Sequence, residues 1–177
     1  MKQKSNISRY TICLCIGLAA TLCAPNASAE DNIKNVSSSI SCTLKITHIS
    51  DGNSMRSSKF RIRLFGVDAP EKQWQCKDTV GRNWDCGLAA KKALEKLVSS
   101  VSQLSCTLMD VDRYGRLVMR CDAGKTDIAT ALVRDGMALA YQQYSKLYIQ
   151  DEITAKKART GVWSGSFIEP WTWRRSQ

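Results

Sequence analysis

The stretch from residue 60 to residue 71 constrains the fold of this 177-residue chain more than any other. Its first six residues alternate along the chain with a period of two, which predicts a half-buried β-strand that carries arginines on its outer face. The residues expected to point inward are Phe60, Ile62 and Leu64, and those expected to point outward are Arg61, Arg63 and Phe65.

A tight bend that carries two carboxylates follows this strand. Gly66 and Pro70 end the strand, and Ala69 is held extended because it precedes a proline. Asp68 and Glu71 therefore lie three residues apart on the bend, where both carboxylates can face one point. Arginines on a strand beside carboxylates on the adjoining turn predict a site for a phosphate and a cation. The alternative is a solvated rim of ion pairs.

The N-terminal residues have the pattern of a secretory signal. Three basic residues precede an apolar run over residues 12–24, and residues 27–29 offer a small-residue cleavage site near Ala29. We therefore expect a signal peptide over residues 1–29 and a disordered, serine-rich leader over residues 30–39. The protein is expected to be exported, either periplasmic or secreted, with no membrane span.

The charge of the chain favours a polyanionic partner. The whole chain has 26 Lys and Arg against 16 Asp and Glu, and removal of residues 1–29 leaves 23 against 16, a net charge of +7. Such an excess suits nucleic acid first and an anionic envelope surface second. The single histidine, His48, is expected on a strand, so nucleases that use histidine bases or histidine metal sites are poor candidates.

Five cysteines follow the predicted signal, and export to an oxidising compartment favours disulfides over metal binding. Cys106 and Cys121 are equidistant from the centre of a predicted hairpin turn, so they should face and pair with each other. Cys76 and Cys86 bracket a polar loop and form the natural second disulfide. Cys42 is left over and is expected to be a buried strand thiol.

The rest of the chain predicts a single α+β domain over residues 40–177. Five short strands could close into a small Greek-key barrel, which leaves no exposed edge, with about three helices and a Trp-rich tail packed back on the body. Asp127 is expected to cap the second helix. The expected strands cover residues 40–47, 104–108, 117–121 and 138–141, besides residues 60–65 and a short strand before them, and the expected helices begin at Gly87, Ile128 and about Ser145.

Several ordered segments carry a family resemblance. They are Asp51-Gly52-Asn53-Ser54, Arg63 to Glu71, Cys86-Gly87-Leu88-Ala89-Ala90, Asp112-Arg113-Tyr114-Gly115-Arg116, Ala131 to Ala138 and Gly161-Val162-Trp163. Together they resemble the thermonuclease (staphylococcal nuclease-like) family, and the tail from Pro170 to Arg174 resembles its disulfide-bearing bacterial envelope branch. The resemblance implies an OB-fold barrel and a calcium-dependent phosphodiesterase that cuts DNA and RNA with little sequence preference.

The resemblance also implies a role for each residue of the site. Asp68 and the backbone carbonyl of Ala69 would bind one calcium ion, and Glu71 would contact the ion through the attacking water that it activates. Arg63 and Arg116 would bind the scissile phosphate and stabilise the charge that builds on it. This chemistry is reasonable because calcium prefers oxygen ligands, a carboxylate can orient water, and guanidinium groups clamp phosphates.

Basic and aromatic residues near the site are implied to bind the nucleotide. Arg113, Tyr114, Tyr141 and Tyr144 fall near positions where the family holds a phosphate or stacks a base, although the spacing before Tyr141 is one residue short. For Tyr141 and Tyr144, plain packing within the domain is the alternative. Asp112 is expected to be a turn residue. The expected partners are single-stranded or frayed DNA and RNA, and the protein is expected to be a monomer.

Asn53 departs from the family pattern, which usually has a calcium-binding aspartate at this position. Asparagine still offers a carbonyl oxygen, but the site loses one negative charge, so Asn53 would be a weak ligand. We expect a nuclease that binds calcium weakly. The alternative is a catalytically inactive OB-fold protein that binds nucleic acid or another polyanion, and a third possibility is an envelope protein that acts on polysaccharide or a protein partner.

Overall fold

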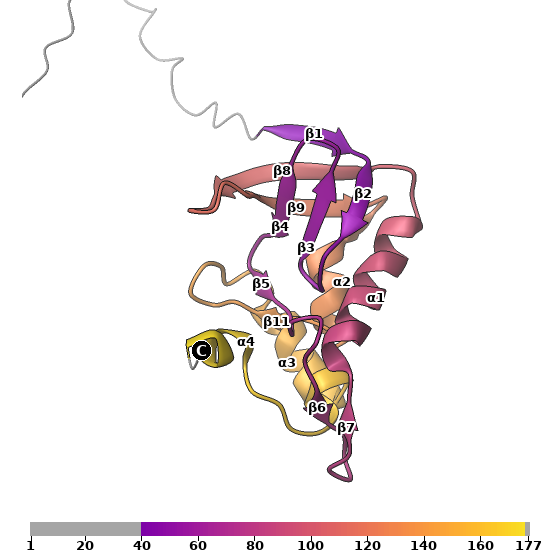
Figure 1. The fold of residues 1–177 in the computed structure, drawn as a ribbon, viewed down its shortest axis with the longest axis vertical. Helices are drawn as coiled ribbons and strands as arrows, with labels where there is room; N and C mark the ends of the chain where they lie inside the picture. The colour runs from indigo at the N-terminus through magenta and orange to yellow at the C-terminus, as the bar shows by residue number, and fades with distance from the viewer. Residues whose placement is uncertain (1–39, 176–177) are drawn as a thin grey trace, which may run out of the picture. The chain divides into compact units, whose positions relative to one another are not determined.

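A computed structural model describes residues 40–175 of the protein. The expected signal peptide (1–29) and leader (30–39) lie outside these described residues. The described residues form a curled sheet with helices beside it (Figure 1). The elements are β1 (Ser41–Leu44), β2 (Ile46–Ile49), β3 (Ser54–Ser57), β4 (Arg61–Leu64), β5 (Val67–Asp68), β6 (Cys76–Lys77), β7 (Asn83–Trp84), α1 (Cys86–Ser99), β8 (Leu104–Val111), β9 (Leu117–Ala123), β10 (Thr126–Asp127), α2 (Ile128–Arg134), β11 (Leu139–Ala140), α3 (Ile149–Ala158), the 3-10 helix η1 (Gly161–Ser164) and α4 (Pro170–Arg175).

The main sheet closes because its two end strands are halves of one bent strand. Its order is β1-β8-β9-β4-β3-β2, with β10 beside β9. β1 and β2 stand at opposite ends of this order, yet only Lys45 separates them in the chain, so the sheet must curl until its ends meet. The strand predicted over residues 40–47 is therefore present but bends at Lys45. Counted with β1 and β2 as one strand and without the short β10, the curled sheet has five strands, which confirms the predicted α+β, OB-fold architecture.

The strand at the beginning of residues 60–71 packs largely as the alternation of its residues predicts. Ile62 and Leu64 of β4 are buried, and Arg61 is exposed. Phe60 differs from the prediction, since it is 46% exposed. It lies one residue before β4 begins, so the pleat of the strand does not direct it into the barrel.

Helices α1 and α2 agree with the predicted helices, whereas α3 starts later than predicted. Asp127 caps α2, because its side chain accepts a hydrogen bond from the backbone N–H of Thr130 at 2.8 Å. α3 begins at Ile149 rather than about Ser145. The hydroxyl of Ser145 accepts a hydrogen bond from the backbone N–H of Leu147, which favours a turn over a helix. With the short α4, the described residues hold four α-helices instead of about three.

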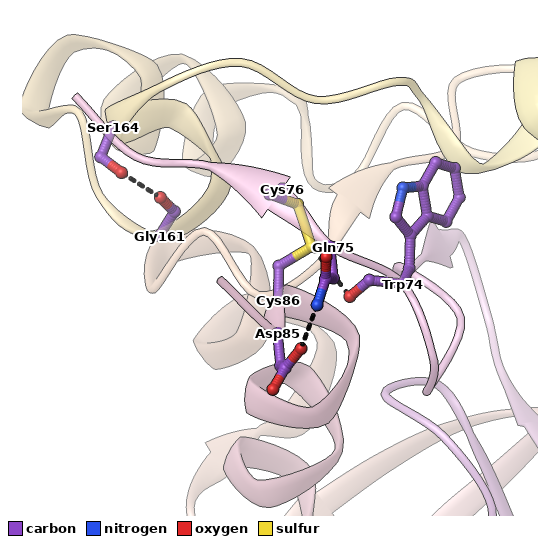
Figure 2. The surroundings of a disulfide bond; sticks show 7 residues. All are labelled: Trp74, Gln75, Cys76, Asp85, Cys86, Gly161 and Ser164. Atoms are coloured by element: carbon purple, nitrogen blue, oxygen red, sulfur yellow. Dashed lines mark hydrogen bonds between the residues drawn. A yellow bond between two sulfur atoms is a disulfide. The ribbon is translucent and has the colours of Figure 1, made fainter. Parts of the chain in front are cut away.

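The structure contains both predicted disulfides. Cys106 and Cys121 are directly opposed on β8 and β9. Cys76 and Cys86 close the loop before α1, as Figure 2 shows. Cys86 also lies 3.6 Å from the backbone carbonyl of Trp74, whose side chain points away from the disulfide (Figure 2). The disulfide therefore ties the loop that carries Trp74 to the beginning of α1.

Cys42 corrects one prediction, because it is exposed rather than buried. It lies opposite Cys106 in the pairing of β1 with β8. Burial increases only toward the end of β1, where Leu44 packs against the core, while Ile40 at the other end is 64% exposed. The alternation of apolar residues in this strand thus continues beyond the part of the sheet that the core covers.

The Trp-rich tail packs back on the body, as predicted. The ring of Trp173 lies 5.0 Å from that of Trp74, and Trp163 contacts Phe167 at 4.9 Å, both between ring centroids. Trp171 packs against a small buried cluster that includes the Cys76–Cys86 disulfide. This second cluster is separate from the barrel core, and the tail packs on it.

Gly87 sets how closely α1 approaches the bend that carries the two carboxylates. Its backbone N–H donates a hydrogen bond to the carbonyl of Trp74 at 3.1 Å. A Cβ atom at this position would lie 1.7 Å from the backbone carbonyl oxygen of Glu71. Any other residue would therefore push α1 and the bend apart.

We expect Gly87→Ala to lower the free energy of unfolding by about 1–3 kcal/mol, because the new methyl group meets rigid backbone. Urea unfolding of both proteins measures this loss. Lys92→Ala, on the exposed face of the same helix, is the control and should change stability by less than about 0.5 kcal/mol. An unchanged urea midpoint for Gly87→Ala would contradict the close approach.

Candidate active site

An open cleft of about 1190 Å³ collects most of the predicted site residues. It is bordered by the turn before β3, by β4, by the β8–β9 hairpin, by the loop after β11 and by α4. Asp68 and Ala69 are buried, at 0% and 3% exposed. The predicted residues that line the cleft are Asn53, Arg63, Glu71, Arg113, Tyr114, Arg116, Tyr141 and Tyr144.

The carboxylate of Asp68 is the centre of the site and has no contact with solvent. Its Oδ1 accepts hydrogen bonds from Arg63 Nη2 at 2.8 Å and from Asn53 Nδ2 at 3.0 Å. Its Oδ2 accepts a hydrogen bond from Arg174 Nη2. A buried carboxylate needs such donors in place of water, because an unpaired buried charge is strongly unfavourable. These three residues therefore make the burial of Asp68 possible.

The side-chain amide of Asn53 has one orientation that its neighbours allow. Its Oδ1 accepts hydrogen bonds from Arg63 Nη1 at 3.0 Å and from the hydroxyl of Ser54 at 3.1 Å, while its Nδ2 donates to Asp68. The reverse orientation would break the bonds to Arg63 and Asp68, because a guanidinium group only donates and a carboxylate only accepts. The amide N–H of Asn53 thus faces Asp68, and its carbonyl oxygen faces Arg63.

Glu71, the second carboxylate of the bend, is joined to Asp68 through Arg174. Arg174 Nη1 lies 3.1 Å from Glu71 Oε1, and Arg174 Nη2 contacts Asp68 Oδ2. Burial lowers the pKa of Arg174, but its hydrogen bonds and charge pairing with the two carboxylates outweigh this effect and raise the pKa above its ordinary value. One guanidinium group therefore bridges the two carboxylates that the bend was predicted to direct toward one point.

Arg116 reaches the cleft from the turn between β8 and β9. Its Nε donates to Asp112 Oδ2 at 2.6 Å, and Asp112 Oδ1 accepts from the backbone N–H groups of Tyr114 and Arg116. Burial raises the pKa of Asp112, but these hydrogen bonds outweigh it and hold the pKa below its usual value. Asp112 is thus a turn residue, as predicted. The guanidinium groups of Arg113 and Arg116 lie 5.0 and 5.5 Å from the ring of Tyr114.

The aromatic residues of the cleft differ in how accessible they are. The ring of Tyr141 lies parallel to that of Trp171, with a centroid distance of 5.2 Å and an interplanar angle of 2°. Tyr144 contacts the edge of Tyr141 and is 64% exposed, and Tyr114 is 57% exposed. Tyr141 is therefore packed against Trp171, whereas Tyr144 and Tyr114 are open to solvent.

The sequence did not predict that Arg174 and Trp171 belong to the site. The tail was expected to pack against the body, but no sequence pattern places Arg174 beside Asp68, which lies 106 residues earlier. The only signal was composition, since the six residues of α4 include Trp171, Trp173, Arg174 and Arg175.

The site offers suitable atoms for calcium but little free negative charge. Its carboxylate, amide and carbonyl oxygens are ligands that calcium prefers. However, the charges of Asp68 and Glu71 are balanced by those of Arg63 and Arg174. Within residues 40–175, no group of three or more His, Cys, Asp and Glu side chains is placed to hold a metal ion. The donor atoms are therefore of the kind that calcium prefers, but in this arrangement the two arginines already neutralise the negative charge that would attract the ion.

The sequence of the chain is similar to those of known nucleases and of one biosynthesis protein. Residues 61–165 match the sequence model of the family described as staphylococcal nuclease homologue. The chain is 32% identical to the succinoglycan biosynthesis protein ExoI of Rhizobium meliloti, over 82% of this chain and 72% of that protein. It is 31% identical to an uncharacterized endonuclease of Haemophilus influenzae (76% and 74%) and 30% identical to a micrococcal nuclease of Shigella flexneri (75% and 80%).

We expect Arg63→Ala to lower the free energy of unfolding by about 1–3 kcal/mol, because Asp68 would stay buried with one donor fewer. Arg61 is the matched control, since it lies on the same strand but is exposed and binds the backbone carbonyl of Tyr114. Arg61→Ala should cost less than about 0.5 kcal/mol. Equal urea midpoints for the two variants would contradict the dependence of Asp68 on Arg63.

Proposed function

The chain belongs to the staphylococcal nuclease homologue family, and from this premise we propose that it is an exported, calcium-dependent nuclease. It hydrolyses phosphodiester bonds of single-stranded or frayed DNA and RNA with little sequence preference. The observation that carries this proposal is the cluster of Asp68, Arg63 and Glu71 at an open cleft, in a chain with a basic excess. Such a cluster combines cation ligands with a phosphate-binding guanidinium group.

The carboxylates of the cleft have different tasks in this proposal. Asp68, the backbone carbonyl of Ala69 and, weakly, Asn53 would hold one calcium ion, which supplies a Lewis acid for the phosphoryl group when bound. Glu71 would bind that ion through a water molecule. The side chain of Glu71 is 30% exposed, so it can hold the attacking water and accept its proton. Burial of Asp68 and partial exposure of Glu71 suit these two tasks.

Two arginines bind the scissile phosphate in this proposal. The guanidinium group of Arg63 is held by Asn53 and Asp68, and that of Arg116 is held by Asp112 through its Nε. Both are partly exposed, at 17% and 26% of the side chain. Guanidinium groups fixed in advance stabilise the charge that develops on the phosphate without first having to reorganise.

Nucleotides bind along the exposed aromatic and basic residues of the cleft. Tyr114 and Tyr144 present open rings on which bases can stack, and Arg113 adds charge beside Tyr114. One face of the Tyr141 ring is covered by Trp171, so a base could stack on that face only in place of Trp171. Stacking and charge act on every base alike, which accounts for the proposed lack of sequence preference.

Export to the periplasm or the medium is part of the proposal. It is supported by the signal-like pattern of residues 1–29 and by two disulfides, which persist in oxidising compartments. Among residues 40–175, no helix is long and apolar enough to cross a membrane. We propose that the exported protein acts as a monomer.

A second candidate function is binding of nucleic acid or another polyanion without cleavage. Asn53 lacks the negative charge of an aspartate, and Arg63 and Arg174 already neutralise Asp68 and Glu71. An OB barrel with a basic cleft binds single strands through charge and stacking alone. This candidate differs from the first only in cleavage, which can be measured directly.

We expect the purified, oxidised protein to cleave single-stranded DNA at a rate that saturates with calcium. Glu71→Gln should lower this rate by a factor of about 10²–10⁴, because the water loses its base. A labelled oligonucleotide in a calcium titration measures both rates. Glu95→Gln, at an exposed carboxylate on α1, is the control and should leave the rate unchanged.

Other outcomes of this assay separate the candidate functions. Salt-sensitive binding of the oligonucleotide without cleavage at any calcium concentration would support the polyanion-binding candidate. Absence of affinity for nucleic acid would contradict both and would favour an envelope protein that acts on polysaccharide or a protein partner.

We expect Asn53→Asp to destabilise the calcium-free protein and to increase its stabilisation by calcium. The new carboxylate would take the place of an amide nitrogen 3.0 Å from Asp68 Oδ1, so two buried negative charges would repel each other until a cation binds. Thermal unfolding with and without calcium measures the change. Asn83→Asp adds the same charge at an exposed position. Equal stabilisation by calcium in all three proteins would place Asn53 outside the cation site.

A further inference from the structure

Helix α4 contacts two places in the cleft that a substrate complex needs. Its Arg174 bridges Asp68 and Glu71, and its Trp171 stacks on Tyr141. Figure 1 shows α4, in yellow, near the loop that follows β11. We propose that residues 167–175 form a strap that closes the resting active site and opens when a divalent cation binds. This inference rests on the proposed function, since it concerns the same site.

Arg174 and a divalent cation cannot share the two carboxylates. Arg174 places a positive charge against Asp68 Oδ2 and Glu71 Oε1, the atoms available to a cation. A guanidinium group and a calcium ion a few ångströms apart repel each other strongly in a partly buried site. The N–H groups of Arg174 also engage lone pairs that would otherwise bind the metal. Binding of the cation and closure of the strap therefore exclude each other.

Trp171 occupies an aromatic surface in the same way. Its ring lies parallel to that of Tyr141 at 5.2 Å, an arrangement that a nucleobase would also adopt on a tyrosine. Tyr144, which contacts the edge of Tyr141, borders the same surface. The strap thus carries an indole where a base would stack and a guanidinium where a cation would bind. Trp171 and Arg174 are three residues apart on α4, so the two groups lie on neighbouring positions of one helix face.

The connections of the strap allow it to open without disrupting the barrel. Residue Ser166 is anchored, because it exchanges two backbone hydrogen bonds with Lys77, at 2.9 and 3.2 Å. Beyond this anchor, the backbone N–H groups of Thr172 and Trp173 donate to Glu169 within the strap itself. Opening therefore breaks side-chain contacts and leaves the strand pairing of the barrel intact.

The Cys76–Cys86 disulfide supports the closed position of the strap. Trp173 of the strap packs on Trp74 at 5.0 Å between centroids. The carbonyl of Trp74 accepts a hydrogen bond from the backbone N–H of Gly87 in α1, and the disulfide joins the beginning of α1 to the same loop (Figure 2). The loop thus provides a surface on which Trp173 of the strap packs, while Trp171 of the strap packs on Tyr141.

Calcium binding to the oxidised full chain, measured by titration calorimetry, tests the strap. Trp171→Ala is the decisive variant, because Trp171 contacts neither carboxylate and its loss changes no charge. It should raise the affinity for calcium about threefold or more, and Arg174→Gln should raise it about tenfold or more, since each removes a contact of the closed state. Arg175→Gln, which changes the net charge equally, should stay within about twofold of the wild type.

Hydrogen–deuterium exchange provides a second readout that does not depend on catalysis. Calcium should increase the exchange of the backbone amides of residues 171–175 in the wild type, and the same amides should exchange rapidly in Arg174→Gln even without calcium. Slower or unchanged exchange with calcium would overturn the strap. So would an affinity for calcium that is the same in the wild type and in Trp171→Ala, or undetectable binding in every variant.

The nuclease assay distinguishes failure of the strap from failure of the proposed function. Calcium-dependent cleavage with no change in affinity in Trp171→Ala would overturn the strap and leave the nuclease. Tighter calcium binding and faster exchange without cleavage in any variant would leave the strap and overturn the nuclease. Cleavage that needs no calcium and is lost in Arg174→Gln would overturn the strap, because Arg174 itself would then be the cation of the site.

Discussion

The complete burial of the Asp68 carboxylate is the constraint on which the rest of the site depends. A charge without solvent needs partners, and the chain supplies them from three distant segments: Asn53 before β3, Arg63 on β4 and Arg174 on α4. Each partner is in turn fixed by this contact, so one carboxylate orders a turn, a strand and the end of the chain. The same arrangement leaves Glu71 partly exposed, and the two carboxylates of one bend acquire different properties.

The barrel supplies the geometry that brings these partners together. Because β1 and β2 are one strand bent at Lys45, the sheet closes, and the hairpin that carries Arg116 comes to border the same cleft as β4. Gly87 lets α1 approach the carboxylate bend, and the Cys76–Cys86 disulfide fixes the loop on which Trp173 packs. The barrel and the disulfide loop therefore act together, one positioning the carboxylates and the other positioning α4.

Much of the local structure could be predicted because its causes lie within a few residues. The alternation around Ile62, the turn residue Asp112, the cap at Asp127 and the opposed pair Cys106–Cys121 all follow from short-range geometry, and the structure contains each of them. The predictions that were wrong concern features whose causes lie far away in the sequence. Cys42 has the pattern of a buried strand residue, but whether a strand face is buried depends on what packs against it.

The sequence by itself determined the strand, the bend with its two carboxylates and the cysteine pairs, because residue types and spacing are sufficient for these. Only the tertiary structure decided that the amide N–H of Asn53 faces Asp68, and that Arg174 bridges Asp68 and Glu71. The reason is physical: the contact between Arg174 and Asp68 spans 106 residues, and it forms only where barrel closure and the packing of the tail meet.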